Sequence, residues 1–112
     1  MTFGGRAKSA KLHFQVGFTY YVFFQDYRRS ATWFEAAARC PDGGETEARF
    51  AAFARYRAGD DRVSLELWKE MAGSTESPQM RDLAEKMVEK LERKLTIQKL
   101  YGPDFIGPIP EL

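Results

Sequence analysis

Hydrophobic residues along the chain recur at three- and four-residue steps between clear breaks, which is the pattern of amphipathic α-helices. The breaks are rich in glycine and proline and fall at residues 4–5, 41–44, 73–78 and 102–110. The segments between them are rich in Ala, Leu, Glu, Lys, Arg and Met, which are good helix formers. No segment alternates apolar and polar positions with β-branched residues, so the pattern predicts an all-α protein.

The breaks, together with residues that favour helix ends, divide the chain into separate helices. The sequence predicts helices over residues 7–24, 27–39, 45–58, 61–72 and 78–100. Asp26, Asp60 and Ser77 stand directly before three of them, where a side-chain oxygen caps the free backbone N–H groups. Gly59 ends the third helix, and Pro78 takes the first position of the last one.

The last helix carries its apolar residues along one stripe of an otherwise charged rod. The stripe consists of Met80, Leu83, Ala84, Met87, Leu91 and Leu95. Three prolines within residues 101–112 predict an extended tail, with Phe105 and Ile106 available to cover the body.

Composition narrows the class of protein and of partner. The chain has 112 residues, 44% hydrophobic and 29% charged, so it can bury the core of one domain. Its 17 basic and 16 acidic residues nearly balance, which predicts neither nucleic acid nor a membrane surface as partner. The sequence contains no apolar run of about 18 residues, so it predicts no membrane-inserted helix. The single cysteine, Cys40, excludes an internal disulfide and is compatible with the cytoplasm without establishing it.

Two stretches of the sequence match each other at one constant offset. The turn at residues 25–27 aligns with residues 59–61, and Phe34 aligns with Trp68. Further pairs at the same offset are Ser30–Ser64, Ala31–Leu65, Trp33–Leu67, Ala37–Met71 and Ala38–Ala72. The offset agrees with the period of about 34 residues, with two helices in each period, that is typical of tetratricopeptide repeats.

The stretch from Val16 to Pro41 resembles the first repeat of such an array. Gly17 precedes aromatic residues in the first helix, a tight turn follows, and Phe34, Ala37 and the terminating Pro41 come next. In the family, a small residue lets the two helices of a hairpin approach closely. A bulky aromatic fills the gap against the next hairpin.

The second stretch, residues 45–78, matches the family less well. It keeps Gly59, Asp60, Trp68 and Pro78. It departs from the family at Arg55 and Asp61, where tyrosine is preferred, and at Met71, where alanine is preferred.

The resemblance implies an architecture for the whole chain, residues 1–112, as a single domain. It implies two antiparallel hairpins at residues 7–40 and 45–73, a capping helix at 78–100 and an extended proline-rich tail at 101–112. Ordinary helical hairpins whose spacing matches the repeat period by chance are the alternative.

The first predicted helix has apolar side chains in nearly every direction around its axis. They are Phe14, Val16, Phe18, Tyr20, Tyr21, Val22, Phe23 and Phe24. A helix that is apolar all round is normally buried on all sides. A homodimer, a hydrophobic segment of another protein, or a preceding repeat of a longer array would cover it. The N-terminal residues and the tail would also cover it by folding back through Phe105, Ile106 and Ile109.

Candidate catalytic chemistry is sparse. His13 is the only histidine and has no Cys, Asp or Glu at metal-ligand spacing, which predicts no zinc site. Cys40 has no base near it in the sequence and stands at a helix end, which favours a packing role over nucleophilic catalysis. The sequence therefore predicts a non-enzymatic protein without metal or cofactor.

The first helix of each tetratricopeptide repeat lines the concave groove of the array, so the resemblance implies partner-binding residues on the two matching helices. They are Gln15, Phe18, Thr19 and Val22 in the first repeat, and Arg49, Phe53, Tyr56 and Arg57 in the second. The two arginines flank the two aromatic residues, which suits an acidic and aromatic peptide.

We therefore predict an interaction or assembly scaffold that binds a protein or peptide partner through this groove or through its aromatic first helix. A structural homodimer is the second hypothesis. An enzyme with an unrecognised site is the third.

Overall fold

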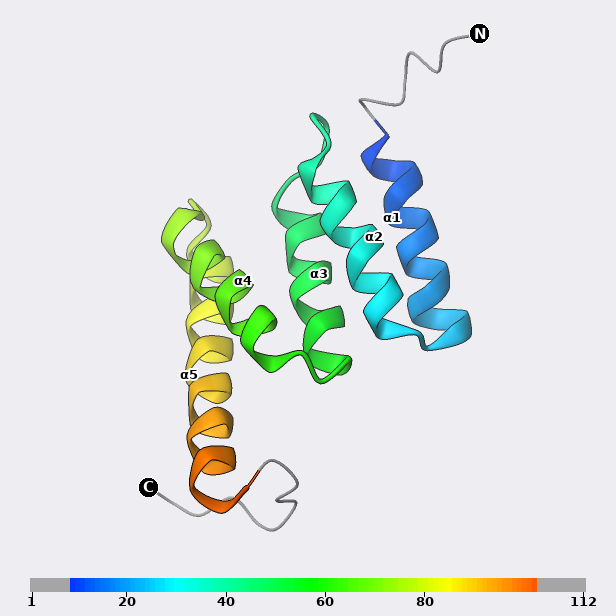
Figure 1. The fold of residues 1–112 in the computed structure, drawn as a ribbon. Helices are drawn as coiled ribbons and strands as arrows, with labels where there is room; N and C mark the ends of the chain where they lie inside the picture. The colour runs from blue at the N-terminus through cyan, green and yellow to red at the C-terminus, as the bar shows by residue number, and fades with distance from the viewer. Residues whose placement is uncertain (1–8, 103–112) are drawn as a thin grey trace, which may run out of the picture.

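The computed structural model describes residues 9–102, and within them it contains helices joined by short turns, with no strand (Figure 1). The α-helices are α1 (Ala10–Thr19), α2 (Tyr27–Arg39), α3 (Glu45–Arg57), α4 (Asp61–Ser74) and α5 (Pro78–Tyr101). A π-helical segment, η2 (Tyr20–Phe24), continues α1. The prediction of an all-α protein is therefore confirmed for the described residues.

Four predicted bounds need correction. The first helix begins at Ala10, after the non-helical Ser9, and the third ends at Arg57 instead of residue 58. The fourth helix extends past residue 72 to Ser74, and the fifth includes Tyr101, where the tail was expected to begin. Residues 103–112 of the predicted tail, including Phe105, Ile106 and Ile109, lie outside the described residues, as do residues 7 and 8 of the first predicted helix.

Each helix packs against the next one in the chain, so α1 to α5 form a single row (Figure 1). The Cα positions span 57 × 33 × 18 Å along the principal axes, so the row is long and thin. Such a row has two ends, α1 and α5, each with a neighbouring helix on only one side.

Two of the three predicted N-caps form. The Asp26 carboxylate accepts a hydrogen bond from the Arg29 backbone N–H at 3.2 Å, and the Ser77 hydroxyl accepts one from Met80 N–H at 3.2 Å. The predicted cap at Asp60 is wrong, because its side chain accepts no backbone bond at the start of α4. Its carboxylate binds the guanidinium groups of neighbouring arginines instead, since charge-assisted bonds are stronger than a bond to a neutral amide.

The first core lies where α1, α2 and α3 meet, around the fully buried ring of Phe34. The ring of Phe14 lies 5.1 Å from Phe34 and 4.9 Å from Phe50. Gly17 lets α1 approach closely, because a Cβ placed there would lie 2.9 Å from two atoms of the Phe34 ring. The Ser30 hydroxyl, also buried, donates to the Gly17 carbonyl at 2.8 Å.

The second core lies between α3, α4 and α5 around the fully buried Trp68. The buried Ser64 hydroxyl donates to the Ala52 carbonyl at 2.9 Å, as Ser30 does to Gly17 in the first core. The two serines align at the repeat offset, but Ser30 follows its acceptor by 13 residues and Ser64 by 12. The first helix pair therefore holds one extra residue, which a π turn accommodates because its hydrogen bonds span five residues instead of four.

Candidate protein-binding surfaces

All four residues expected to bind a partner from the first helix are exposed: Gln15, Phe18, Thr19 and Val22. Phe18 and Val22 are 44% and 46% exposed, which is high for large apolar side chains in a folded core helix. The buried residues of α1 are Ala10 and Gly17, both small, and the rings that contact Phe34 of α2 come from the half-buried Phe14 and Tyr21.

Five large apolar side chains of α1 and η2 remain exposed at this end of the row. We call Leu12, Phe18, Val22, Phe23 and Phe24 the apolar end face. Leu12 is 61% exposed, Phe23 76% and Phe24 68%. These five are the majority of the nine large hydrophobic side chains that are exposed within residues 9–102. A concentration of exposed apolar side chains on one helical segment favours an interaction site.

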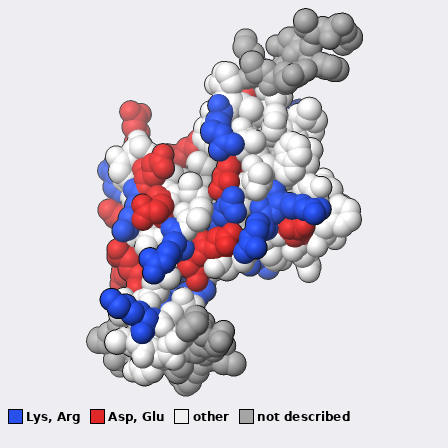
Figure 2. Space-filling view, viewed as in Figure 1, with Lys and Arg blue, Asp and Glu red and all other residues white. Residues whose placement is uncertain are grey.

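The segment that carries the apolar end face is itself uncharged, although Arg29 lies 6.0 Å from the Tyr20 ring and pairs with Asp26. The segment from Leu12 to Gln25 contains no Asp, Glu, Lys or Arg. Figure 2 shows charged side chains over the middle, the α4–α5 side and the lower end of the α1 region, while the upper part of the α1 region is largely white. Removing an uncharged apolar surface from water costs no solvation free energy of charged groups, so such a surface favours a contact without water.

The opposite end of the row, α5, exposes a charged surface. Ion pairs between successive turns join Lys86 to Asp82 at 2.9 Å and Arg93 to Glu89 at 3.3 Å. The apolar stripe of α5 instead faces the second core, where Met80, Ala84, Met87 and Leu91 are buried. The α5 end of the row therefore presents charged side chains to solvent, and the α1 end presents apolar ones.

Two of the residues expected to bind a partner from the second repeat pack within the chain. The ring of Phe53 lies 4.8 Å from Trp68 in an edge-to-face contact. The Nζ atoms of Lys90 and Lys94 lie 5.1 and 5.3 Å from the centre of the Tyr56 ring. Both aromatic rings therefore help to hold α3 against α4 and α5, a role that the sequence spacing did not reveal.

The two arginines of this set lie over aromatic rings. Arg49 lies 5.8 Å from the ring of its neighbour Phe50. Arg57 lies 5.5 Å from the ring of Tyr21 and 4.7 Å from that of Tyr27, and it donates a hydrogen bond to the Tyr21 hydroxyl at 3.5 Å. This hydrogen bond raises the pKa of Arg57 above its usual value. The structure thus brings Arg57 to η2 and α2 through Tyr21 and Tyr27, which were not on the expected groove.

A network of charged side chains links α2 to α3 and to the turn between α3 and α4. Arg55 donates to both carboxylate oxygens of Glu35, at 2.9 and 2.7 Å, and to Asp60 at 3.2 Å. Arg28 also binds Asp60, at 3.0 Å. The hydrogen bond to Glu35 raises the pKa of Arg55, and the hydrogen bond from Arg28 lowers the pKa of Asp60. Arg55, which stands where the resemblance predicts tyrosine, is therefore the centre of this network.

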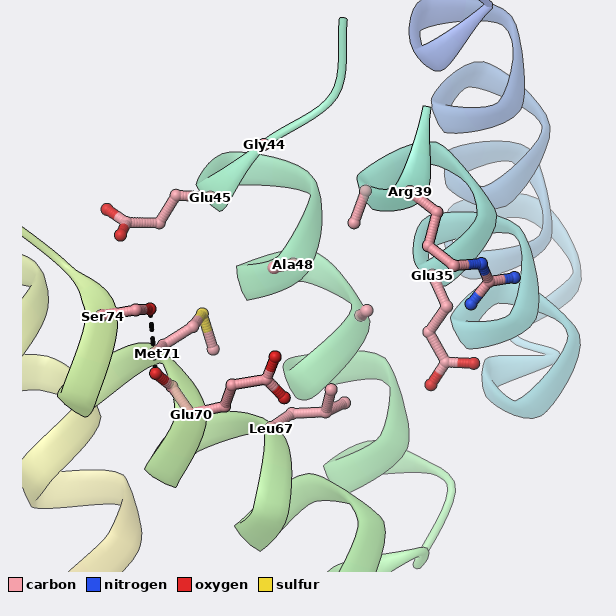
Figure 3. Close-up of a pocket in the computed structure, with 11 residues that line it drawn as sticks. Glu35, Arg39, Gly44, Glu45, Ala48, Leu67, Glu70, Met71 and Ser74 are labelled. Carbon is pink, nitrogen blue, oxygen red and sulfur yellow. Dashed lines mark hydrogen bonds between the residues drawn. The ribbon is translucent and has the colours of Figure 1, made fainter. Parts of the chain in front are cut away.

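A cleft of about 440 Å³ opens between α2 and α4, over the first half of α3 (Figure 3). Ala48, Leu67 and Met71 supply apolar lining, and the Ser74 hydroxyl donates to the Glu70 carbonyl at 2.9 Å. The charged lining residues are Glu35, Arg39, Glu45 and Glu70. Because Arg55 already pairs with Glu35, the remaining charged residues are Arg39, Glu45 and Glu70, and this excess of one carboxylate favours a cationic group over an anionic one at the cleft.

The structure brings His13 and Cys40 together, which their separation in the sequence concealed. The Cys40 Sγ lies 3.9 Å from His13 Nδ1, but it donates to the Ala36 carbonyl at 3.3 Å. His13 Nδ1 lies 2.8 Å from the Ser9 carbonyl, and its ring contacts Trp33. Among residues 9–102, no three His, Cys, Asp or Glu side chains are grouped in a way that would hold a metal ion.

No helix in the described part of the chain is long and apolar enough to cross a membrane. No protein-family model, curated protein or solved structure matches the chain. Inference about function therefore rests on the surfaces of the molecule itself.

Proposed function

We propose that this chain is a non-catalytic interaction module that binds an apolar segment of another protein chain through the apolar end face. The observation that carries the proposal is the exposure of five large apolar side chains on α1 and η2, within a segment that contains no charged residue. Folded domains rarely expose so much apolar surface to water, and where they do, the surface usually binds a partner.

A tetratricopeptide-like arrangement, with helix pairs at residues 7–40 and 45–73, is part of the proposal. It is supported by two buried positions that recur at the repeat offset. Ser30 and Ser64 donate to a carbonyl of the preceding helix, and Phe34 and Trp68 fill the two cores. In such an arrangement α1 is the outermost helix, and a further helical element would pack against it.

The groove is the less favoured of the two binding surfaces. Phe53 and Tyr56 already have partners within the chain, so a groove ligand would find mainly Arg49 and Arg57 on α3. Phe18 and Val22 belong both to the predicted groove and to the apolar end face, and they remain exposed. An amphipathic helix that lays its apolar side on α1 satisfies this geometry.

Site-specific photo-crosslinking in cells tests the proposal. A benzophenone amino acid replaces Phe23, which is 76% exposed, and in a control it replaces Leu100 on α5, which is 65% exposed. We expect a covalent adduct with another protein chain from position 23 and none from position 100.

An Arg49→Glu/Arg57→Glu variant separates the end face from the groove. We expect its adduct at position 23 to be unchanged. Loss of that adduct would move the binding site to the groove. Equal adducts at positions 23 and 100, or none at all, would contradict the proposal.

A further inference from the structure

We infer that the partner of the apolar end face is a second copy of this chain, paired α1 against α1 about a twofold axis. The inference rests on the proposed function, because the same five side chains form the contact. It adds the identity of the partner and the symmetry of the complex.

The chemistry of the two ends of the row selects this pairing. The segment from Leu12 to Gln25 contains no charged residue, so the side chains of the contact themselves bring no like charges together. Arg29, which lies 6.0 Å from the Tyr20 ring, is paired with Asp26 at 3.5 Å. Stacking α1 of one copy on α5 of the next would instead bury ion pairs such as Lys86–Asp82 and Arg93–Glu89 against phenylalanine rings. Desolvating charges costs free energy that an apolar surface does not return. The like ends therefore pair, which closes the assembly at two copies.

The exposed area is sufficient for a dimer. Phe18, Phe23 and Phe24 are 44%, 76% and 68% exposed, so together they leave nearly two whole phenylalanine side chains uncovered. At roughly 150–250 Å² for each aromatic side chain, the three contribute about 300–450 Å² in each copy. Two copies thus supply about 600–900 Å² from these rings alone, and a specific interface needs about 1,200 Å². Leu12, Val22 and the polar residues between them bring the total into that range.

The geometry of α1 places a small residue near the middle of the interface. Thr19 lies between Leu12 and Phe23 and, like Leu12, follows a buried residue of α1 by two positions. Since two residues correspond to about 200° around a helix, Leu12 and Thr19 point away from α2. Thr19 is exposed, and its hydroxyl donates to the Gln15 carbonyl at 2.9 Å, which leaves its methyl group available for contact. A twofold axis near Thr19 brings the two copies of this residue close together.

The first experiment is sedimentation equilibrium of the full chain over protein concentrations from about 1 to 100 µM, the range expected for a modest interface. Val22→Glu and Val63→Glu are a matched pair, because these valines are 46% and 44% exposed and lie at the apolar end face and on α4. We expect a wild-type dimer. Each interface would contain two buried charges in the Val22→Glu variant, so its dissociation constant should rise by at least about 100-fold. The Val63→Glu variant should remain within about threefold of the wild type, as a surface change should. Circular dichroism verifies that both variants are folded.

The second experiment is disulfide trapping in a Cys40→Ser background. Thr19→Cys is compared with Thr96→Cys on α5, because both threonines are exposed and both donate to the carbonyl four residues earlier. We expect mild oxidation to cross-link Thr19→Cys into a covalent dimer much faster than Thr96→Cys.

A wild-type chain that stays monomeric at about 100 µM overturns the inference. So do equal effects of the two glutamate variants, equal cross-linking of the two cysteine variants, or growth into assemblies larger than a dimer. If the chain is a monomer and position 23 forms an adduct with a different protein, the inference that the partner is a second copy is overturned, and the proposed function still stands. A monomer that forms no adduct at position 23 overturns both.

Discussion

Replacing Gly17 with alanine tests the close contact on which the first helix pair depends. The added Cβ would lie 2.9 Å from Phe34 Cδ1 and Cε1, and 3.2 Å from the Ser30 carbonyl oxygen. The Phe34 ring is fully buried and packed against Phe14, so it has little room to move away. The helices must therefore separate, or the ring must leave its favoured position.

Two opposing effects set the size of the change. Alanine is favoured over glycine within a helix by about 0.5–1 kcal/mol. Overpacking a core costs about 1–3 kcal/mol. Because Cβ would meet two ring atoms and a backbone oxygen, the cost should exceed the gain, and we expect a net loss of about 1–2 kcal/mol. For a chain of this size the melting temperature should fall by roughly 5–10 °C.

Gly73→Ala provides the matched control for this prediction. Gly73 lies in α4, and a Cβ at this position would have no neighbour within 4 Å. Urea unfolding of both variants at one protein concentration should show Gly73→Ala equal to the wild type or slightly more stable, and Gly17→Ala less stable. If Gly17→Ala matches Gly73→Ala, the helices do not depend on a glycine at their crossing and the reasoning is refuted.

Two further predictions concern polar groups, one buried and one partly exposed. Ser64→Ala should lower the free energy of unfolding by about 1 kcal/mol, because its hydroxyl donates a buried hydrogen bond. Ser74→Ala, which loses an exposed bond of the same length, should change it little; equal losses in urea unfolding would contradict this. Asp60 should stabilise the fold in its charged form, because the hydrogen bond from Arg28 lowers its pKa. That contribution is complete above the ordinary pKa of about 3.9 and is lost as the pH falls through the lower pKa of the folded state. Asp60→Asn should therefore be less stable than the wild type at neutral pH, with the difference shrinking below about pH 4; a difference independent of pH would refute this.

Much of the secondary structure could be predicted from the sequence, because helix ends are decided by neighbouring residues. Asp26 and Ser77 cap the helices that they precede, and Gly59 ends α3 with a positive φ of 84°. The failed cap at Asp60 shows the limit of this reasoning. Arg28 and Arg55 compete for its carboxylate, and Arg28 lies 32 residues away in the sequence.

The candidate site was harder to predict, because a resemblance to a repeat family indicates a helix but not what each side chain contacts. Gln15, Phe18, Thr19 and Val22 lie on the surface as expected. Phe53 and Tyr56, however, have partners within the chain, on α4 and α5 respectively. The contact between His13 and Cys40 was missed for the same reason, since 27 residues separate them.

The sequence by itself determined that the chain is helical and where most of its helices end, because capping, glycine and proline effects and the hydrophobic period act over a few residues. It also determined that Ser30 and Ser64 hold equivalent places in two similar stretches. It also determined that the first helix has too many apolar residues for one buried face. Only the tertiary structure decided which of them are exposed. Close approach at Gly17 turns the small side of α1 toward α2, so Phe23 and Phe24 are left in water at the end of the row. That outcome depends on contacts between helices, which no local pattern specifies.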